Sequence, residues 1–507
     1  MNNNFKNAMS SATNYTYTEN GALTHTSTLN NVYDMFAMGA AMRKRSDEDI
    51  LIMFKNACAE NINMALKCLF YIRDIRSGQG ERRFFKTCLK WLADSEYYET
   101  IIASESELFF QEIIAIGRYD DLYTFVDTQM ESLMFAYLFK TIKNDLHALK
   151  NDKPVSLCAK WLKSENTSSK ESKELARKTR MAFGMTPRQY RVALSRLRKK
   201  IKIVETTMSQ GDWNDIDFAT LPSRASFKYR NAFMNSEIIG DKYKEFISNK
   251  DTKVKAGALY PYEITGEICH LLYEANLANM PIDKSKRQIM NKYWDNLNDY
   301  FNGCSFNGIA MVDTSESMYG IPLNVAASIG IYCAEKNNGP FGNCYMTFSE
   351  DPKFITMSSN LDIVDKVNIF LDNCIVASTN IEAAFDLILN TAKRKHLSQD
   401  DIPQNLIIIS DMEFNDAVTH SSRNIDTLME NIKRDWEQNG YKMPHLIFWN
   451  VDARQNNIPM SLKAGDVSYV SGFSPSIFSA ILTGKSGLDL MYETIDKPRY
   501  DFKVAIY

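Results

Sequence analysis

The sequence lacks any long apolar run, and this absence argues against membrane insertion and export. No stretch of about 18 apolar residues occurs, so no segment has the composition of a transmembrane helix. The opening residues 1–14, MNNNFKNAMSSATN, contain no apolar core of the kind found in signal peptides. We therefore expect a cytoplasmic protein that does not associate with membranes.

Paired cysteines are also missing. The nine Cys are scattered, none forms a C-x-x-C pair, and the six His make no ligand cluster with them. An odd, dispersed set is typical of free thiols in a reducing compartment. Cys269 and His270 are neighbours, but adjacent side chains point to different sides of a helix or strand, so we expect no zinc site.

The sequence also lacks a strong excess of either charge, and it lacks the common enzyme motifs. The net charge of −3 gives the whole molecule no general attraction to nucleic acid, so any such attraction must come from a local patch. The sequence contains no G-x-S-x-G, no P-loop and no recognisable nucleophile–base pair. We accordingly expect a protein that is not an enzyme.

The first 300 residues are dominated by apolar residues at helical spacing. Ile50, Leu51, Phe54 and Ala57 are one example, and strand-like runs are almost absent. We expect roughly a dozen helices with short connectors, which favours a HEAT-like helical-repeat stack. A bundle or irregular α-domain is the competing arrangement.

After residue 300 strands and helices alternate. The sequence predicts strands at 308–312, 344–348, 354–357, 406–409, 445–451 and 467–470, and helices at 322–335, 381–392 and 425–436. This order predicts a doubly wound, mostly parallel sheet covered on both sides, and hence an α plus α/β fold class overall. The expected organisation is a polar segment at 1–20, a helical-repeat domain at 21–295 and an α/β domain at 296–507.

Three polar segments fall at the ends of predicted strands or at the start of a helix. They are 313–317 (DTSES), 378–384 (STNIEAA) and 410–413 (SDME). Ligands of such sheets bind at the carboxyl ends of the strands. Carboxylate and hydroxyl oxygens are the ligands that a hard divalent cation prefers. The alternation in the first segment places Asp313, Ser315 and Ser317 on one side of the turn.

These three segments resemble, in the same order, the metal-ion-dependent adhesion site (MIDAS) of von Willebrand factor A (vWA) domains. The resemblance implies a Mg²⁺ ion, or another divalent cation such as Mn²⁺ or Ca²⁺. Its ligands, direct or through water, would be Asp313, Ser315, Ser317, Thr379 and Asp411. One position would stay open for an oxygen of a partner. Many intracellular members have Gly where this chain has Glu316.

Segments from both halves of the chain resemble the Ro-like proteins, which join a helical-repeat TROVE module to a C-terminal vWA domain. Residues 73–82 (RDIRSGQGER), 256–259 (AGAL), 410–414 (SDMEF) and 471–473 (SGF) are similar to an uncharacterised branch of that group. The resemblance covers nearly the whole chain. It implies a helical ring closed by the vWA domain, with structured small RNAs or single-stranded RNA ends as partners.

A local excess of positive charge supports an RNA partner independently of the family resemblance. Residues 170–202 hold twelve Lys and Arg against Glu171 and Glu174, and phosphate contacts dominate nucleic-acid affinity. Phe183 and Tyr190 lie in the same stretch and could stack on unpaired bases. The alternative is a solvated helix face. The predicted RNA-binding residues are Arg177, Lys178, Arg180, Arg188, Arg191, Arg196, Arg198, Lys199 and Lys200, with Arg76 and Arg82 from a second basic segment.

That second segment, 73–83, also has an alternative interpretation. Gly78 and Gly80 permit a tight turn whose backbone N–H groups could hold an anion. A plain helix–helix turn, with Glu81 paired to an arginine, is slightly favoured.

Two hypotheses of function therefore stand. The leading one is a non-enzymatic RNA-binding ribonucleoprotein component with a metal-binding vWA domain. The alternative is a protein-interaction scaffold whose metal captures an acidic residue of a partner, without RNA. Neither the identity of an RNA nor the oligomeric state follows from the sequence.

Overall fold

The computed structural model describes residues 14–98, 105–348, 351–374, 380–416, 427–464 and 466–501. These residues pack as two compact units. The sheet unit takes in 14–72, 77–84 and 256–500, and the helical unit takes in 73–76, 85–255 and 501. No helix in the described residues is long and apolar enough to cross a membrane.

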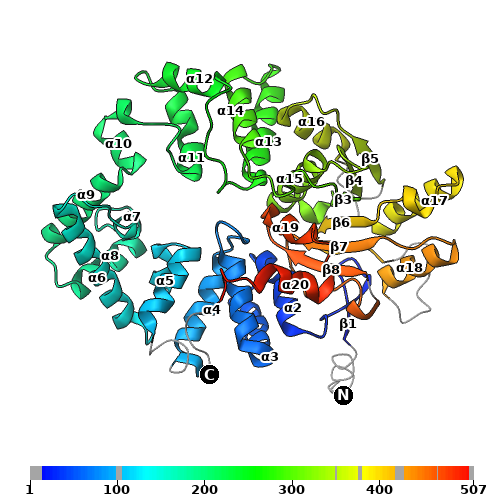
Figure 1. Ribbon diagram of the computed structural model, residues 1–507, viewed down its shortest axis with the longest axis horizontal. Helices are drawn as coiled ribbons and strands as arrows, with labels where there is room; N and C mark the ends of the chain where they lie inside the picture. Colours follow the sequence, from blue (N-terminus) through cyan, green and yellow to red (C-terminus); the bar gives the residue numbers. More distant parts are fainter. Residues whose placement is uncertain are drawn as a thin grey trace. The chain divides into compact units, whose positions relative to one another are not determined.

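A six-stranded sheet forms the centre of the sheet unit, with the strand order β5-β4-β3-β6-β7-β8 (Figure 1). β5 is antiparallel to β4, and all other neighbours are parallel. The strands are β3 (Gly308–Asp313), β4 (Cys344–Phe348), β5 (Lys353–Thr356), β6 (Asn405–Ser410), β7 (His445–Asn450) and β8 (Val467–Ser471).

The sheet has a topological switch point between β3 and β6. The chain winds outward from β3 through β4 to β5, then returns to β6 on the other side of β3 and winds outward again to β8. The crevice outside the carboxyl ends of the two strands at such a point is the usual ligand position in doubly wound sheets. The α plus α/β class with a mostly parallel sheet is thus confirmed.

Helices cover this sheet on both faces. All six residues of β3 are buried, which requires cover from both sides. α15 packs on β3, β4 and β6, and α2 packs on β7 and β8. The helices of the unit are α2 (Asn31–Met38), α3 (Asp47–Arg73, whose last residue belongs to the helical unit), α13 (Pro261–Ala278), α14 (Lys284–Asp295), α15 (Ile321–Lys336), α16 (Ile363–Asn373), α17 (Ile381–Lys395), α18 (Leu428–Gln438), α19 (Phe478–Ile481) and α20 (Gly487–Ile495).

The packing boundary differs from the division predicted at residue 296. α13 packs against α15 and α16, and α14 packs against α16, so both helices belong with the sheet. An N-terminal hairpin joins them there, formed by β1 (Tyr15–Tyr17) and β2 (Leu23–His25). The sheet unit therefore gathers segments from both halves of the chain.

The described part of the helical unit contains helices and no strands. Its helices are α4 (Arg83–Ala93, whose first two residues belong to the sheet unit), α5 (Ser106–Ile116), α6 (Glu131–Lys150), α7 (Cys158–Trp161), α8 (Lys170–Ala182), α9 (Pro187–Ile201), α10 (Val204–Gln210), α11 (Ser223–Met234) and α12 (Gly240–Ser248). α6 packs against α7, α8 and α9, and α11 packs against α12.

Local sequence fixes the limits of α9, the helix that carries most of the predicted RNA-binding residues. Thr186 caps its first turn through a reciprocal hydrogen-bond pair with Gln189, and Pro187 occupies the first helical position. Lys202 ends the helix in the left-handed conformation. Tyr190, Leu194 and Leu197 form its buried side, so the opposite side faces solvent.

Candidate metal centre and basic helix

The carboxyl ends of β3 and β6 bring two of the three predicted polar segments together. Val312 pairs with Ile409, so Asp313 and Ser410 follow side by side. The Ser410 hydroxyl donates a 2.5 Å hydrogen bond to Asp313 Oδ2. The Ser315 backbone N–H donates a 2.9 Å bond to Asp313 Oδ1. Asp313 is fully buried, so its carboxylate is held in one orientation.

Two serine hydroxyls and a second carboxylate lie beside Asp313. The Oγ atoms of Ser315 and Ser317 are 3.1 Å apart, and Ser317 forms a hydrogen bond with the carboxylate of Asp411. Ser315 and Asp411 are buried and Ser317 is half-buried. We call Asp313, Ser315, Ser317 and Asp411 the oxygen cluster. Their proximity is the arrangement that the spacing of the segments predicts.

Arg454 supplies positive charge at one side of the oxygen cluster. Its guanidinium donates a 3.1 Å hydrogen bond to Asp411 Oδ2 and also pairs with Glu19 at 2.9 Å. The Glu413 backbone N–H donates to the other oxygen of Asp411 at 3.2 Å. Asp411 is thus held by an internal cation, whereas Asp313 is held by neutral donors.

The two carboxylates of the cluster are electrostatically strained. Burial, and next the nearby Asp411, raise the pKa of Asp313 to about 7. Burial also raises the pKa of Asp411, although its hydrogen bond with Ser317 and the charge of Arg454 oppose that shift. Two carboxylates withdrawn from water favour a cation between them.

The oxygen donors of the cluster suit a hydrated Mg²⁺ ion better than they suit Ca²⁺, which needs more protein ligands. Within the described ranges, no three His, Cys, Asp or Glu side chains group as metal ligands. The oxygen cluster instead offers two carboxylates and two hydroxyls. Mg²⁺ keeps several waters and uses one or two carboxylates, whereas Ca²⁺ takes six to eight oxygens. Thr379 lies outside the described residues, and Glu316 is exposed.

A strap of N-terminal residues, Thr18 to Asn20, crosses the segment that follows Asp411. The Thr18 hydroxyl donates to the Phe414 carbonyl at 2.6 Å, and the Glu19 N–H donates to Glu413 Oε2 at 2.7 Å. Burial raises the pKa of Glu413 to about 7. Sequence reasoning missed this contact, because almost 400 residues separate the partners and neither segment has a local signal for the other.

Four cations of α9 and its C-cap form a basic stripe: Arg188, Arg191, Lys199 and Lys202. Their spacing places them on one face of the helix, and all four are exposed. Among the described residues, none of them pairs with an acidic side chain. Arg196 is also exposed, to one side of the stripe. This is the surface that the local excess of charge predicts.

Several other predicted RNA-binding cations are engaged with acidic residues. Pairing reduces the net field that such a cation offers to a phosphate, so these residues are weaker candidates than the stripe. The pairs are Arg177–Glu174 at 2.8 Å, Lys178–Asp127 at 2.5 Å, Arg180–Glu165 at 2.7 Å, and Lys200–Asp152.

Arg198 and the two aromatic residues differ from the prediction. Arg198 is half-buried and donates to the carbonyls of Ala159 (2.9 Å) and Leu162 (2.7 Å) and to the Ser164 hydroxyl (2.7 Å). Tyr190 and Phe183 are 2% and 4% exposed, so they belong to the core and do not present rings to bases. The expectation of base stacking by these two residues is therefore corrected, because the apolar side of α9 buries them.

The arginine at the start of the 73–82 segment holds the helical unit together. Arg73 and Asp121 form a buried ion pair at 2.7 Å. Arg76 is exposed and donates a 3.1 Å hydrogen bond to the Ala115 carbonyl. These contacts favour the structural interpretation of this segment.

The glycine-containing end of the segment is fixed within the sheet unit. Gln79 donates to Tyr71 Oη at 2.7 Å and accepts from the Ser474 N–H at 3.0 Å. Gly80 has a φ of +63°, and a Cβ atom there would lie 1.9 Å from Tyr260 Oη. The turn therefore packs against protein. Arg82 is exposed.

Comparisons with known proteins match almost the whole chain. Residues 18–126 and 162–302 match the family described as Domain of unknown function (DUF2828), and residues 307–501 match Domain of unknown function (DUF7788). A protein of Acanthamoeba polyphaga mimivirus, named Uncharacterized protein L728, is 29% identical over 93% of this chain and 85% of its own length. The crystal structure of the Deinococcus radiodurans Ro (RSR) protein is similar over 89% of this chain and 93% of that chain, with 13% identity and a TM-score of 0.42.

Proposed function

We propose that this chain is a non-enzymatic RNA-binding protein. Its helical unit holds the RNA backbone along the basic stripe of α9, and its sheet unit holds a divalent cation at the oxygen cluster. The observation that carries the RNA part is the row of four exposed cations that lack acidic partners in the described residues. The Ro-like resemblance of the sequence supports the same partner.

The dimensions of the stripe suit a polyanion. Arg188 and Lys202 are 14 residues apart, which corresponds to about 21 Å along a helix. A row of this length can contact several phosphates, and each contact releases condensed counterions. Affinity for RNA should therefore fall steeply with salt and depend little on base sequence.

A salt titration of RNA binding tests this proposal. The Arg188→Gln/Lys199→Gln variant removes two cations of the stripe, and Arg177→Gln/Lys200→Gln removes two cations that are paired with acids. We expect the first variant to bind a single-stranded oligonucleotide more weakly and to flatten the slope of log K against log salt by about 1.4, at roughly 0.7 per lost contact. The second should change both quantities less. Equal affinity and slope in wild type and both variants would overturn the proposal.

The oxygen cluster would hold the cation through its two carboxylates and two hydroxyls. Mg²⁺ bound there would neutralise Asp313 and Asp411 and offer a coordination position to an anionic oxygen of a partner. Within the chain, Ser410 and the Ser315 N–H orient the Asp313 carboxylate. Ser317 links the two carboxylate loops through its hydrogen bonds.

A second candidate function is a protein scaffold. Two and four residues after Ser317, Tyr319 and Ile321 are 80% and 56% exposed, so apolar side chains follow the cluster segment at the surface. Exposed aromatic and aliphatic side chains beside a cation suit a protein partner with an acidic residue. A protein complex that dissociates on chelation and on Asp313→Ala, in a chain that binds no RNA, would favour the scaffold.

A further inference from the structure

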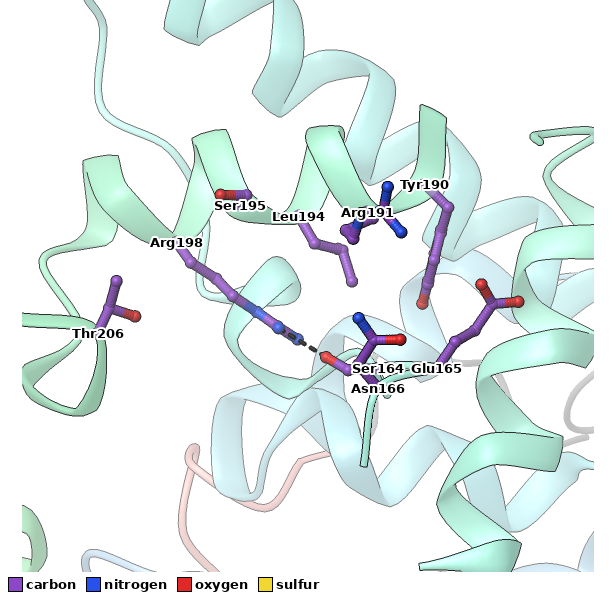
Figure 2. Close-up of a pocket in the computed structure, with 9 residues that line it drawn as sticks. All are labelled: Ser164, Glu165, Asn166, Tyr190, Arg191, Leu194, Ser195, Arg198 and Thr206. Carbon is purple, nitrogen blue, oxygen red and sulfur yellow. Dashed lines mark hydrogen bonds between the residues drawn. The ribbon is translucent and has the colours of Figure 1, made fainter. Parts of the chain in front are cut away.

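Two hollows in the helical unit open on either side of the same arginine. The smaller, of about 250 Å³, lies between α9 and the segment 164–166 (Figure 2). The larger, of about 590 Å³, lies between the C-terminal end of α9, α10 and the segment 212–221. Arg198 and Thr206 line both. The hollows are therefore adjoining parts of one groove.

Arg198 gives this groove a positive charge that no carboxylate neutralises in the described residues. Its three hydrogen bonds all go to neutral oxygens, those of Ala159, Leu162 and Ser164, and Figure 2 shows the last of these. Burial lowers the pKa of its guanidinium. A guanidinium has five N–H groups, so two remain for a ligand. A half-buried charge with spare donors favours an anion.

The walls around Arg198 add polar groups of the right kind. Arg191 lines the smaller hollow from the preceding turns of α9 and has no acidic partner among the described residues. The hydroxyls of Ser195 and Thr206 and the amide of Asn166 line it too. Glu165 is the acidic group in this lining, and Arg180 holds its carboxylate at 2.7 Å.

The larger hollow also carries carboxylates. Asp212, Asp215 and Asp217 line it together with Lys199 and Lys202 of the α9 end. Carboxylates accept hydrogen bonds from hydroxyl and amino groups but repel phosphates. The groove as a whole thus suits a ligand with a phosphate at one end and hydrogen-bond donors at the other.

We propose that the smaller hollow binds a phosphomonoester group, with Arg191 and Arg198 as its cationic ligands and with hydroxyl or amino groups of the same molecule in the larger hollow. A planar guanidinium can bind phosphate through two parallel hydrogen bonds. The group can come from a free mononucleotide or from the phosphorylated end of an RNA. This site is separate in its chemistry from the basic stripe, which contacts phosphodiesters at the surface, and Arg191 is the residue common to both.

Calorimetric titration of the full chain tests the site. The probes are inorganic phosphate, adenosine 5′-monophosphate and adenosine, with a ten-residue oligoadenylate that carries either a 5′-phosphate or a 5′-hydroxyl. We expect the monophosphate to bind at least about tenfold more tightly than adenosine. A preference of similar size for the 5′-phosphorylated oligomer would assign the site to RNA ends, and its absence would assign it to the free nucleotide.

Matched variants separate the pocket from the helix surface. Arg191→Gln should weaken monophosphate binding about tenfold, whereas Arg188→Gln, the same change three residues away and outside the hollow, should leave it within about twofold. Ser195→Trp should block the smaller hollow from an exposed position, and Val192→Trp is its control on the same helix. An unchanged melting temperature verifies that each variant folds.

Two outcomes would overturn the inference. One is equal binding, or no binding, of adenosine and its monophosphate. The other is an equal loss for Arg188→Gln and Arg191→Gln, which would indicate general attraction to the helix surface. Neither result contradicts RNA binding by the basic stripe, because the salt titration of RNA binding tests that proposal separately. Conversely, a failed salt titration with intact monophosphate binding would overturn the proposed function alone.

Discussion

The oxygen cluster and the basic stripe both concentrate charge of one sign, and they are built in opposite ways. In the cluster, Asp313 and Asp411 are buried and fixed by hydrogen bonds at the ends of strands. In the stripe, Arg188 and Lys199 are exposed on one face of a helix. Buried like charges demand a ligand of defined geometry, whereas exposed ones are screened by water and salt. The first arrangement suits an ion, and the second suits a flexible polyanion.

The largest predicted effect concerns the cluster. In wild type, Mg²⁺ at about 100 times its Kd should raise the free energy of unfolding by about 2.7 kcal/mol, because the ion binds the folded state only. Asp313→Ala should remove this increment while the chain still folds, since Asp313 is the last residue of β3 and lies at the carboxyl-end edge of the sheet. Thermal melts with Mg²⁺ and with a chelator measure the difference.

The neighbouring carboxylate supplies the control. Glu316 is exposed and forms no part of the oxygen cluster, so Glu316→Ala should retain the full Mg²⁺ response. If wild type melts at the same temperature with and without Mg²⁺, the oxygen cluster does not bind the ion. The proposed difference between an ion site in the cluster and a polyanion site in the stripe is then wrong.

The next largest effect concerns Arg198, the half-buried cation of α9 that donates hydrogen bonds to backbone carbonyls. Arg198→Met should lower the free energy of unfolding by about 2 kcal/mol, because it leaves the carbonyls of Ala159 and Leu162 without their donors. Lys199→Met, the adjacent exposed cation, should change stability by less than about 0.5 kcal/mol. Urea unfolding of both variants makes the comparison, and equal stabilities would mean that Arg198 is an ordinary surface cation.

The smallest effect concerns Arg454, the internal cation of the cluster. Arg454→Met removes the positive charge that pairs with Asp411 and competes with a metal ion for it. Mg²⁺ should then bind more tightly, by up to about tenfold. The ion's Kd, measured by calorimetry in wild type and variant, tests this. A weaker Mg²⁺ affinity in the variant would show that Arg454 supports the site instead of competing with it.

Much of the sheet unit was predictable from local patterns. The continuous apolar run 406–409 marked β6, and the polar residues after it and after β3 marked the edge of the sheet where the two strands end side by side. The short apolar stretch 308–312 predicted β3 in the same way, as a run of consecutive apolar residues. These inferences succeeded because each depends on a few consecutive residues and on a rule about sheets.

Other features could not be read in this way. The strap from Thr18 to Asn20 contacts Glu413 across almost 400 residues of sequence. α13 and α14 join the sheet unit, although their sequences read as part of the helical half. The basic segment from Lys170 to Lys202 looked uniform in the sequence. Within the described part of the chain, the positions of Glu165, Asp127 and Asp152 separate cations that have an acidic partner from cations that have none.

The sequence alone determined the order of the six strands, the carboxylates and hydroxyls at the strand ends, and the excess of positive charge around α9. These are properties of residues that are close in sequence. Strands repeat every two residues and helices every 3.6, so both can be recognised from the sequence. The tertiary structure decided which of those charges are buried, which are paired and which stay open to a ligand. That decision depends on contacts between residues far apart in sequence, because burial and pairing set the energy of a charge and no local pattern encodes them.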